Sequence, residues 1–154
     1  MTNKLTILAG LAIASATLIP AFNQATQAQA PPVQSSNCVY LREVTTGKSV
    51  IRKVVATANT NANVDFAVPS GIPFRSYIAE FLPENNARFR VAVNFRFADN
   101  TTSNAITRDL NPARRFFLYN VQLVSSTGQI PFQVNTNVVG QRNTAYSVAV
   151  LACQ

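Results

Sequence analysis

The stretch at residues 88–99 constrains the fold most, because large apolar residues alternate with polar or small ones along it. The apolar side carries Phe89, Val91, Val93, Phe95 and Phe97, and the other side carries Arg88, Arg90, Ala92, Asn94, Arg96 and Ala98. A sustained period of two places successive side chains on opposite faces of a strand. The pattern therefore predicts a strand with one face in a core and the other in solvent.

Shorter β-branched and aromatic runs lie on both sides of this strand. A second alternating run covers residues 144–153, and others fall at 39–45, 50–57, 64–68, 117–124 and 132–139. Turn-forming residues separate these runs, at 46–48, 59–63, 69–71, 83–86, 99–100, 111–112, 127–128 and 139–140. Short strands joined by turns at this spacing predict an all-β fold, a single antiparallel β-sandwich of about 7 to 9 strands.

The segment at residues 74–82 fits two kinds of secondary structure. Its apolar residues have the spacing of a helix stripe, at Phe74, Tyr77, Ile78, Phe81 and Leu82. As a strand, the segment turns Tyr77 and Phe81 to one face and Ile78 and Leu82 to the other. We favour the strand, because the following residues have the composition of a hairpin loop. The helix is the alternative.

The amino-terminal segment has the layout of a secretory signal peptide. Lys4 precedes an uncharged apolar run at residues 5–22. Ala28 and Ala30 then supply the small residues of a cleavage site, with the cut after either position. We therefore expect residues 1–30 to be a cleaved signal peptide.

A retained membrane anchor is the alternative for this segment. Gly10 and Pro20 interrupt its apolar run, and no cationic residue follows directly, as one often does beside a spanning helix. We therefore favour cleavage. The expected organisation after residues 1–30 is an extended polar lead-in at 31–37 and one β-sandwich domain at 38–154.

The two cysteines of the chain, Cys38 and Cys153, lie near the two ends of this domain. An even number of cysteines in an exported chain favours a disulfide. Such a bond requires the first and last strands to lie close together. The alternative is a pair of buried free thiols. We expect the protein to be exported, to the periplasm, the cell surface or the extracellular medium.

The composition excludes several kinds of active site. The chain has no histidine, which excludes serine–histidine and cysteine–histidine catalysis in their usual form and imidazole-bound zinc. Its five glycines are isolated and form no phosphate-binding loop. We therefore expect no catalytic residue, no metal and no cofactor.

Carboxylates are what remains for an enzyme, and the chain has six: Glu43, Asp65, Glu80, Glu84, Asp99 and Asp109. A glycoside hydrolase needs two of them about 5 to 10 Å apart. Glu80, Glu84 and Asp99 flank the expected hairpin and the strand after it, so a small secreted glycoside hydrolase is one alternative function. Residues 99–104 also offer oxygen ligands, but they lack the spacing and the bidentate glutamate of a dedicated calcium loop.

Arginine is the positive feature of the sequence. Lys4 is the only charged residue of the leader, so the remaining chain carries 12 Lys and Arg against 6 Asp and Glu, a net charge of +6. Guanidinium groups bind carboxylate, phosphate and sulfate bidentately. The candidate ligand-binding residues lie on the outward side of the strand at 88–99 and near the start of another strand: Arg88, Arg90, Arg96, Arg108, Arg114 and Arg115.

These observations predict a non-catalytic exported protein that binds an anionic partner through an arginine-rich sheet face. The candidate partners are an acidic envelope polysaccharide, anionic lipid head groups and an acidic protein. Nucleic acid is not expected, because an exported protein seldom meets it, although the charge would permit binding. The alternative for the arginines is an ordinary solvated face that keeps the domain soluble.

A fimbria-like structural subunit is a further alternative function. Such a subunit donates an extended amino-terminal strand to its neighbour, and this strand should alternate apolar and polar residues. Residues 31–37 contain two prolines and do not alternate, and proline removes a ladder donor. This alternative is therefore less favoured. Nothing in the sequence predicts the oligomeric state.

Overall fold

The computed structural model describes residues 37–57 and 62–154, and in these residues the regular secondary structure is entirely β. The expected signal peptide and nearly all of the lead-in lie outside the described residues. The strands are β1 (Cys38–Tyr40), β2 (Arg42–Glu43), β3 (Val50–Val54), β4 (Ala62–Ala67), β5 (Ser76–Pro83), β6 (Ala87–Arg96), β7 (Thr102–Ala113), β8 (Tyr119–Leu123), β9 (Gln133–Gly140) and β10 (Ala145–Cys153).

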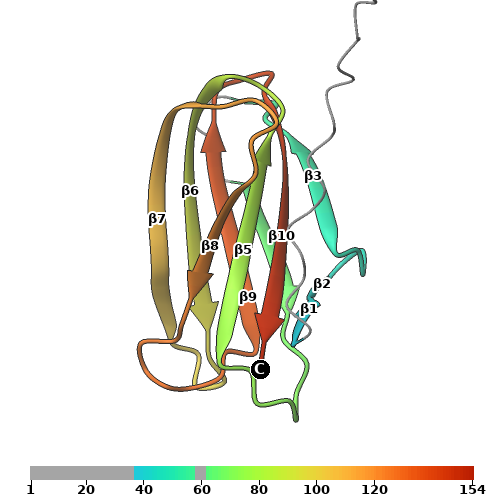
Figure 1. Ribbon diagram of the computed structural model, residues 1–154, viewed down its shortest axis with the longest axis vertical. Helices are drawn as coiled ribbons and strands as arrows, with labels where there is room; N and C mark the ends of the chain where they lie inside the picture. Colours follow the sequence, from blue (N-terminus) through green and yellow to red (C-terminus); the bar gives the residue numbers. More distant parts are fainter. Residues whose placement is uncertain (1–36, 58–61) are drawn as a thin grey trace, which may run out of the picture. The chain divides into compact units, whose positions relative to one another are not determined.

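The strands form two five-stranded antiparallel sheets, and Figure 1 shows one in front of the other. In sheet A, β10 pairs with β5 on one side and with β1 and β3 on the other, and β8 pairs with the far side of β5. Sheet B has the order β2-β4-β9-β6-β7. The chain passes from sheet A to sheet B at Leu41, between β1 and β2. The expected all-β antiparallel sandwich is therefore confirmed.

Aromatic side chains from both sheets make the centre of the core. Phe81 and Tyr146 of sheet A lie 5.2 and 5.9 Å, between ring centroids, from Phe89 of sheet B. Tyr77 and Phe95 make a second contact between the sheets, at 5.1 Å. Pairs of this geometry contribute about 0.5 to 1.5 kcal/mol beyond the area that they bury. These contacts fix the two sheets face to face.

The strands predicted at residues 88–99 and 74–82 are confirmed as β6 and β5. In β6, Phe89, Val93 and Phe95 are buried, while the alternate arginines are exposed. Residues 76–83 form the strand β5 and no helix, with Tyr77 and Phe81 facing the core. The neighbouring strands decide this outcome, because β5 pairs along its length with β10 and also with β8.

One long strand, β7, was not predicted. The sequence predicts a turn at residues 111–112, whereas the chain runs as a strand from Thr102 to Ala113. The strand is an edge with much of its surface in solvent, so it lacks a long apolar face. An edge strand also tolerates Pro112, since only one side of it must donate hydrogen bonds.

The structure also differs from the predicted turn at residues 139–140, because Gly140 is the last residue of β9. It pairs with Phe89 of β6. A Cβ atom at this position would lie 2.9 Å from the Phe89 ring, which is closer than packed carbon atoms approach each other. The glycine is therefore needed for the close approach of an aromatic ring.

The predicted disulfide joins Cys38 and Cys153, with their Cα atoms 4.1 Å apart. The two residues are register partners in the pairing of β1 with β10. The bond closes a loop of 115 residues, so it fastens the first strand of the domain to the last.

We expect Cys153→Ser, made together with Cys38→Ser, to lower the free energy of unfolding by about 2 to 5 kcal/mol, as removal of a native disulfide from a small secreted domain does. Chemical denaturation of the purified domain measures this difference. Wild-type protein treated with reductant should match the double variant. Equal stability of oxidised and reduced protein would contradict the prediction.

Candidate functional site

The outer face of sheet B carries the arginines of β6. Arg88, Arg90 and Arg96 are exposed there, on the side opposite the buried phenylalanines. Arg42 of β2 lies on the same face, because it pairs with Ala67, whose partner Gln133 pairs with Arg96. With Asp65 and Asp109 also on this face, four arginines against two aspartates leave a charge of +2.

A row of hydrogen-bonded side chains crosses the same face. Asn104 of β7 donates to Asn94 of β6 (2.9 Å), Asn94 donates to Asn135 of β9 (3.3 Å), and Asn135 donates to Asp65 of β4 (2.7 Å). We call these four residues the amide row. It spans four adjacent strands, or about 14 Å at the usual strand spacing.

The arginines lie on either side of the amide row. Arg96 is the next outward residue beyond Asn94 on β6, and Arg90 lies two outward positions on the other side of Asn94. Arg90 and Arg96 are therefore about 20 Å apart along the strand. The Arg96 guanidinium also donates to Gln133, with 3.5 Å between Nη1 and Oε1. The face thus combines amide donors and acceptors with guanidinium groups at its two ends.

Sequence reasoning missed the amide row. The composition near 59–63 and 99–104 predicts turns, with oxygen ligands also present at 99–104, and indicates no row of hydrogen-bonded side chains across strands. The available signal was the alternation of Gln133, Asn135 and Asn137 with the buried residues between them. This is the same period that identified β6, with amides in the outward positions.

Arg108, Arg114 and Arg115 do not lie on this face, and they are not near the start of one strand as expected: Arg108 lies within β7, and the other two follow its end. A register shift separates the pairs Asn94–Asn104 and Val93–Ile106, so Ala105 is an extra residue in β7. Such a bulge reverses which side the following residues face. Arg108 pairs with Val91 and lies on the inner side of sheet B.

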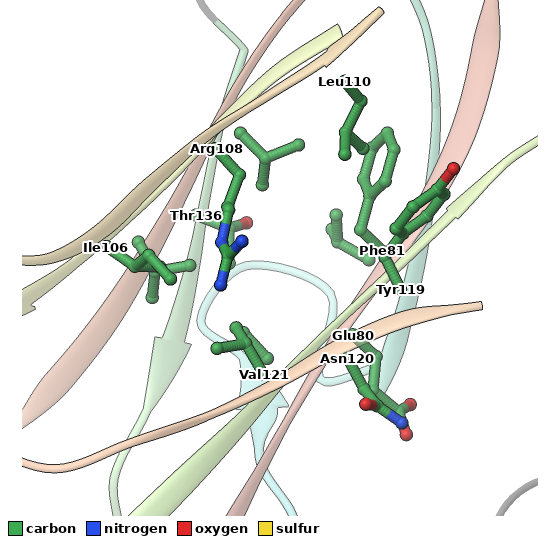
Figure 2. A pocket seen from close by; sticks show the side chains of 13 residues that line it. Glu80, Phe81, Ile106, Arg108, Leu110, Tyr119, Asn120, Val121 and Thr136 are labelled. Atoms are coloured by element: carbon green, nitrogen blue, oxygen red, sulfur yellow. The ribbon is translucent and has the colours of Figure 1, made fainter. Parts of the chain in front are cut away.

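Arg108 lies at a cavity of about 280 Å³ between the edge strands β7 and β8. Apolar side chains of both sheets line it, among them Val93, Ile106, Leu110 and Val121. Figure 2 shows the Arg108 side chain extending beside Ile106 toward Val121. The cavity exists because both edges leave the inner faces of the sheets incompletely covered.

Arg114 and Arg115 lie in the connection between β7 and β8, next to two exposed rings. Phe116 is 61% exposed and Phe117 is 44% exposed. The Arg115 guanidinium carbon lies 4.5 Å from the Phe116 ring centroid, and that of Arg114 lies 5.8 Å from the Phe117 centroid. We call residues 114–117 the arginine–phenylalanine loop.

Phe116 holds a backbone conformation that large residues rarely adopt, with φ of 55°. Its amide donates to the carbonyl of Pro83 (2.8 Å), and the amide of Arg115 donates to the Asn86 side chain (2.7 Å). A left-handed conformation of a non-glycine residue costs about 1 to 3 kcal/mol and often marks a functional position. Hydrogen bonds to the neighbouring hairpin therefore hold an exposed ring in a strained conformation.

Several carboxylates serve local structure. Hydrogen bonds from Thr46 and Thr45 hold the pKa of Glu43 at about 2. Hydrogen bonds from Thr101 lower the pKa of Asp99, and the bidentate Arg52 lowers that of Glu84. Glu84 precedes β6 and Asp99 follows it, so about 30 Å of strand separates them. They do not form the close pair considered from the sequence.

Glu80 differs from these carboxylates. It lies on the outer side of sheet A, where burial raises its pKa despite a hydrogen bond from the Tyr40 hydroxyl (3.2 Å). Figure 2 shows Glu80 beside Asn120, with both side chains directed away from the cavity. Its strand partners include Ala149 of β10 and Asn120 of β8, and neither can supply a positive charge.

We expect Glu80→Gln to raise the thermal midpoint at pH 7 by about 1 to 3 °C. Because the pKa of Glu80 is raised in the folded state, its contribution to stability is present at low pH and lost as the pH rises through that pKa. Gln keeps an acceptor for Tyr40 without the charge. Thermal unfolding of wild type and variant between pH 3 and 8 measures the effect.

The difference between wild type and Glu80→Gln should vanish at low pH, where Glu80 is neutral. Glu84→Gln is the matched control, because the pKa of Glu84 is lowered and its charge is favourable. That variant should be slightly less stable than wild type at pH 7. A Glu80→Gln variant less stable than wild type at pH 7 would disprove the prediction.

Within the described parts of the chain, no three histidine, cysteine, aspartate or glutamate side chains are grouped so that they could hold a metal ion. The same residues contain no helix long and apolar enough to cross a membrane.

Two tyrosine hydroxyls are buried in the core, where burial raises the pKa of Tyr77 and Tyr146 to about 12. Neither hydroxyl has a hydrogen-bond partner among the described residues.

No protein-family model matches the chain, and no curated protein matches it. Among solved structures, the chain is similar to the enzymatically active domain of tailspike protein 4 of bacteriophage CBA120, with 14% identity and a TM-score of 0.48, over 77% of this chain and 20% of that one. It is also similar to the CBM22-1–GH10 modules of Clostridium thermocellum xylanase 10B, solved with xylohexaose, with 8% identity and a TM-score of 0.44, over 77% and 26%.

The chain therefore spans about a fifth to a quarter of the length of these two chains. At these identities and TM-scores, the likeness carries no argument about function.

Proposed function

We propose that this protein is a non-catalytic exported module that binds an acidic polysaccharide on the outer face of sheet B. The observation that carries the proposal is the exposure of Arg88, Arg90 and Arg96 on one sheet face, on both sides of the amide row. Guanidinium groups bind the carboxylate or sulfate groups of the polymer. Amide groups offer both donors and acceptors to the sugar hydroxyls between them.

The spacing of the arginines suits a polymer better than a single small ion. Arg88 and Arg90 lie about 7 Å apart, and Arg96 lies about 20 Å beyond Arg90. One small anion cannot contact both ends of the face, whereas a chain of several acidic sugars can. None of the three arginines forms an ion pair with another residue that the structure describes, so their charges are available to a ligand.

We expect the triple variant Arg88→Gln, Arg90→Gln and Arg96→Gln to bind alginate at least about tenfold more weakly than wild type. Each exposed charge pair contributes up to about 1 kcal/mol, and the three contributions add. Affinity electrophoresis or calorimetry with soluble alginate measures the change. Wild-type affinity should fall as salt rises, because screening at physiological ionic strength acts over about 8 Å.

The matched control is Arg75→Gln, Arg114→Gln and Arg142→Gln, which removes the same charge from exposed arginines elsewhere. This control should retain most of the affinity, and both variants should keep the wild-type thermal midpoint. Equal losses of affinity in the two triple variants would show that binding depends on net charge alone and would reject the site. The single variant Asn94→Ala should also bind alginate more weakly than wild type. The loss should be a larger factor at high salt than at low salt, because hydrogen bonds then contribute relatively more than charges.

A second candidate function, attachment to an anionic lipid surface, is favoured by the arginine–phenylalanine loop. Two adjacent exposed rings and two guanidinium groups have the chemistry of a membrane interface, where rings enter the headgroup region and arginines meet lipid phosphates. The strained backbone of Phe116 keeps one ring directed outward. This candidate uses a different surface from the polysaccharide face.

We expect Phe116→Asn to weaken binding to vesicles that contain phosphatidylglycerol by about tenfold, because the variant loses the burial of one aromatic ring. Asparagine tolerates a positive φ, so the fold should be at least as stable as wild type. Co-sedimentation measures binding, and Phe132→Asn is the control at another exposed ring. Equal vesicle binding by both variants and wild type would exclude a role for the loop.

A further inference from the structure

Arg108 is exposed to solvent and lies at the border of the cavity between β7 and β8, whose other lining is mostly apolar. Arg108 makes no hydrogen bond or ion pair with any residue that the structure describes, although it lies on the inner side of sheet B. Among the described residues that line the cavity, Glu80 is the only carboxylate, and its side chain points away toward Asn120 (Figure 2). It also accepts a hydrogen bond from Tyr40. An anion in the cavity would therefore meet a guanidinium group without a competing carboxylate.

We propose that this cavity binds a small amphipathic carboxylate, a medium-chain fatty acid or an arylalkanoic acid of similar size. The apolar part would lie among Val93, Ile106, Leu110 and Val121, and the carboxylate would accept hydrogen bonds from Arg108. This site is independent of the polysaccharide face, because it lies on the opposite side of sheet B.

The volume of the cavity limits the length of the ligand. At about 280 Å³, the cavity is larger than the ~150 Å³ cavity that holds benzene. It also lies at the lower end of the volumes of small-molecule sites. A chain of about eight carbons therefore fits, whereas a long-chain fatty acid does not.

A second explanation for Arg108 is protection of the sheet edge. Inward-pointing charges on edge strands discourage pairing with another chain. This role requires no ligand, and it predicts that loss of the charge increases self-association without affecting any ligand. The two explanations therefore give different results when the charge is removed.

Calorimetry of the disulfide-bonded domain with hexanoate, octanoate and dodecanoate tests the proposal. Each added methylene should lower the Kd about fourfold until the cavity is filled, so octanoate should bind more tightly than hexanoate. Dodecanoate should gain nothing over octanoate. Absence of binding by all three carboxylates at millimolar concentration would overturn the proposal.

The variant Arg108→Gln tests the role of the charge. It should raise the Kd of octanoate about tenfold and leave that of neutral 1-octanol unchanged. Arg96→Gln, on the outer face of the same sheet, is the control and should bind octanoate as wild type does. Wild-type octanoate affinity in Arg108→Gln would reject the site, and self-association of that variant in gel filtration would then assign Arg108 to edge protection.

A cavity-filling variant locates the ligand. Val121 is partly buried at the cavity wall, and Val121→Phe should occupy the space and abolish binding of both octanoate and 1-octanol. Ile106→Phe is an equivalent change from the opposite sheet and is used if the first variant fails to fold. Unchanged octanoate binding in a folded variant of either kind would place the ligand elsewhere and overturn the proposal.

Discussion

Strand β10 is the element on which sheet A depends. It pairs with β5 along one side and with both β1 and β3 along the other, so three strands have their position fixed by one. Its residues are buried on both faces for most of its length, including Leu151 and Ala152. The disulfide to Cys38 fastens the same strand to the start of the domain. Loss of β10 would leave β1 and β3 without a partner in sheet A.

The position of β10 also decides where the domain has free surface. The aromatic contacts of Tyr146 and Phe81 close the middle of the sandwich, and a cavity lies where an edge strand of sheet A is near an edge strand of sheet B. Among the described residues, β7 and β8 border the cavity found there. Sheet B is left with a broad outer face, on which polar side chains can hydrogen-bond to one another across strands.

The sequence predicted those parts of the fold in which burial imposes a regular pattern. The phenylalanine side of β6 follows from its period of two, and the bond between Cys38 and Cys153 follows from the even number of cysteines together with the expected export. The position of Glu80 on the outer side of β5 follows from alternation alone. The amide row could have been predicted from alternation in β9, but its hydrogen bonds depend on the register of four strands that are distant in sequence. Contacts of that kind are not encoded locally.

Strand β7 shows most clearly why the positions of the remaining candidate arginines could not be predicted. Up to Asn104, the even-numbered residues of β7 face outward. Because Ala105 is an extra residue, the even-numbered residues from Ile106 onward face inward. Without this bulge, Arg108 would lie on the outer face together with Arg90. With it, the guanidinium group faces an apolar cavity and Asp109 takes the outward position beside Arg90. One inserted residue therefore places Arg90 on the outer face proposed to bind an acidic polymer and Arg108 at the cavity proposed to bind a small amphipathic acid, on opposite sides of the same sheet.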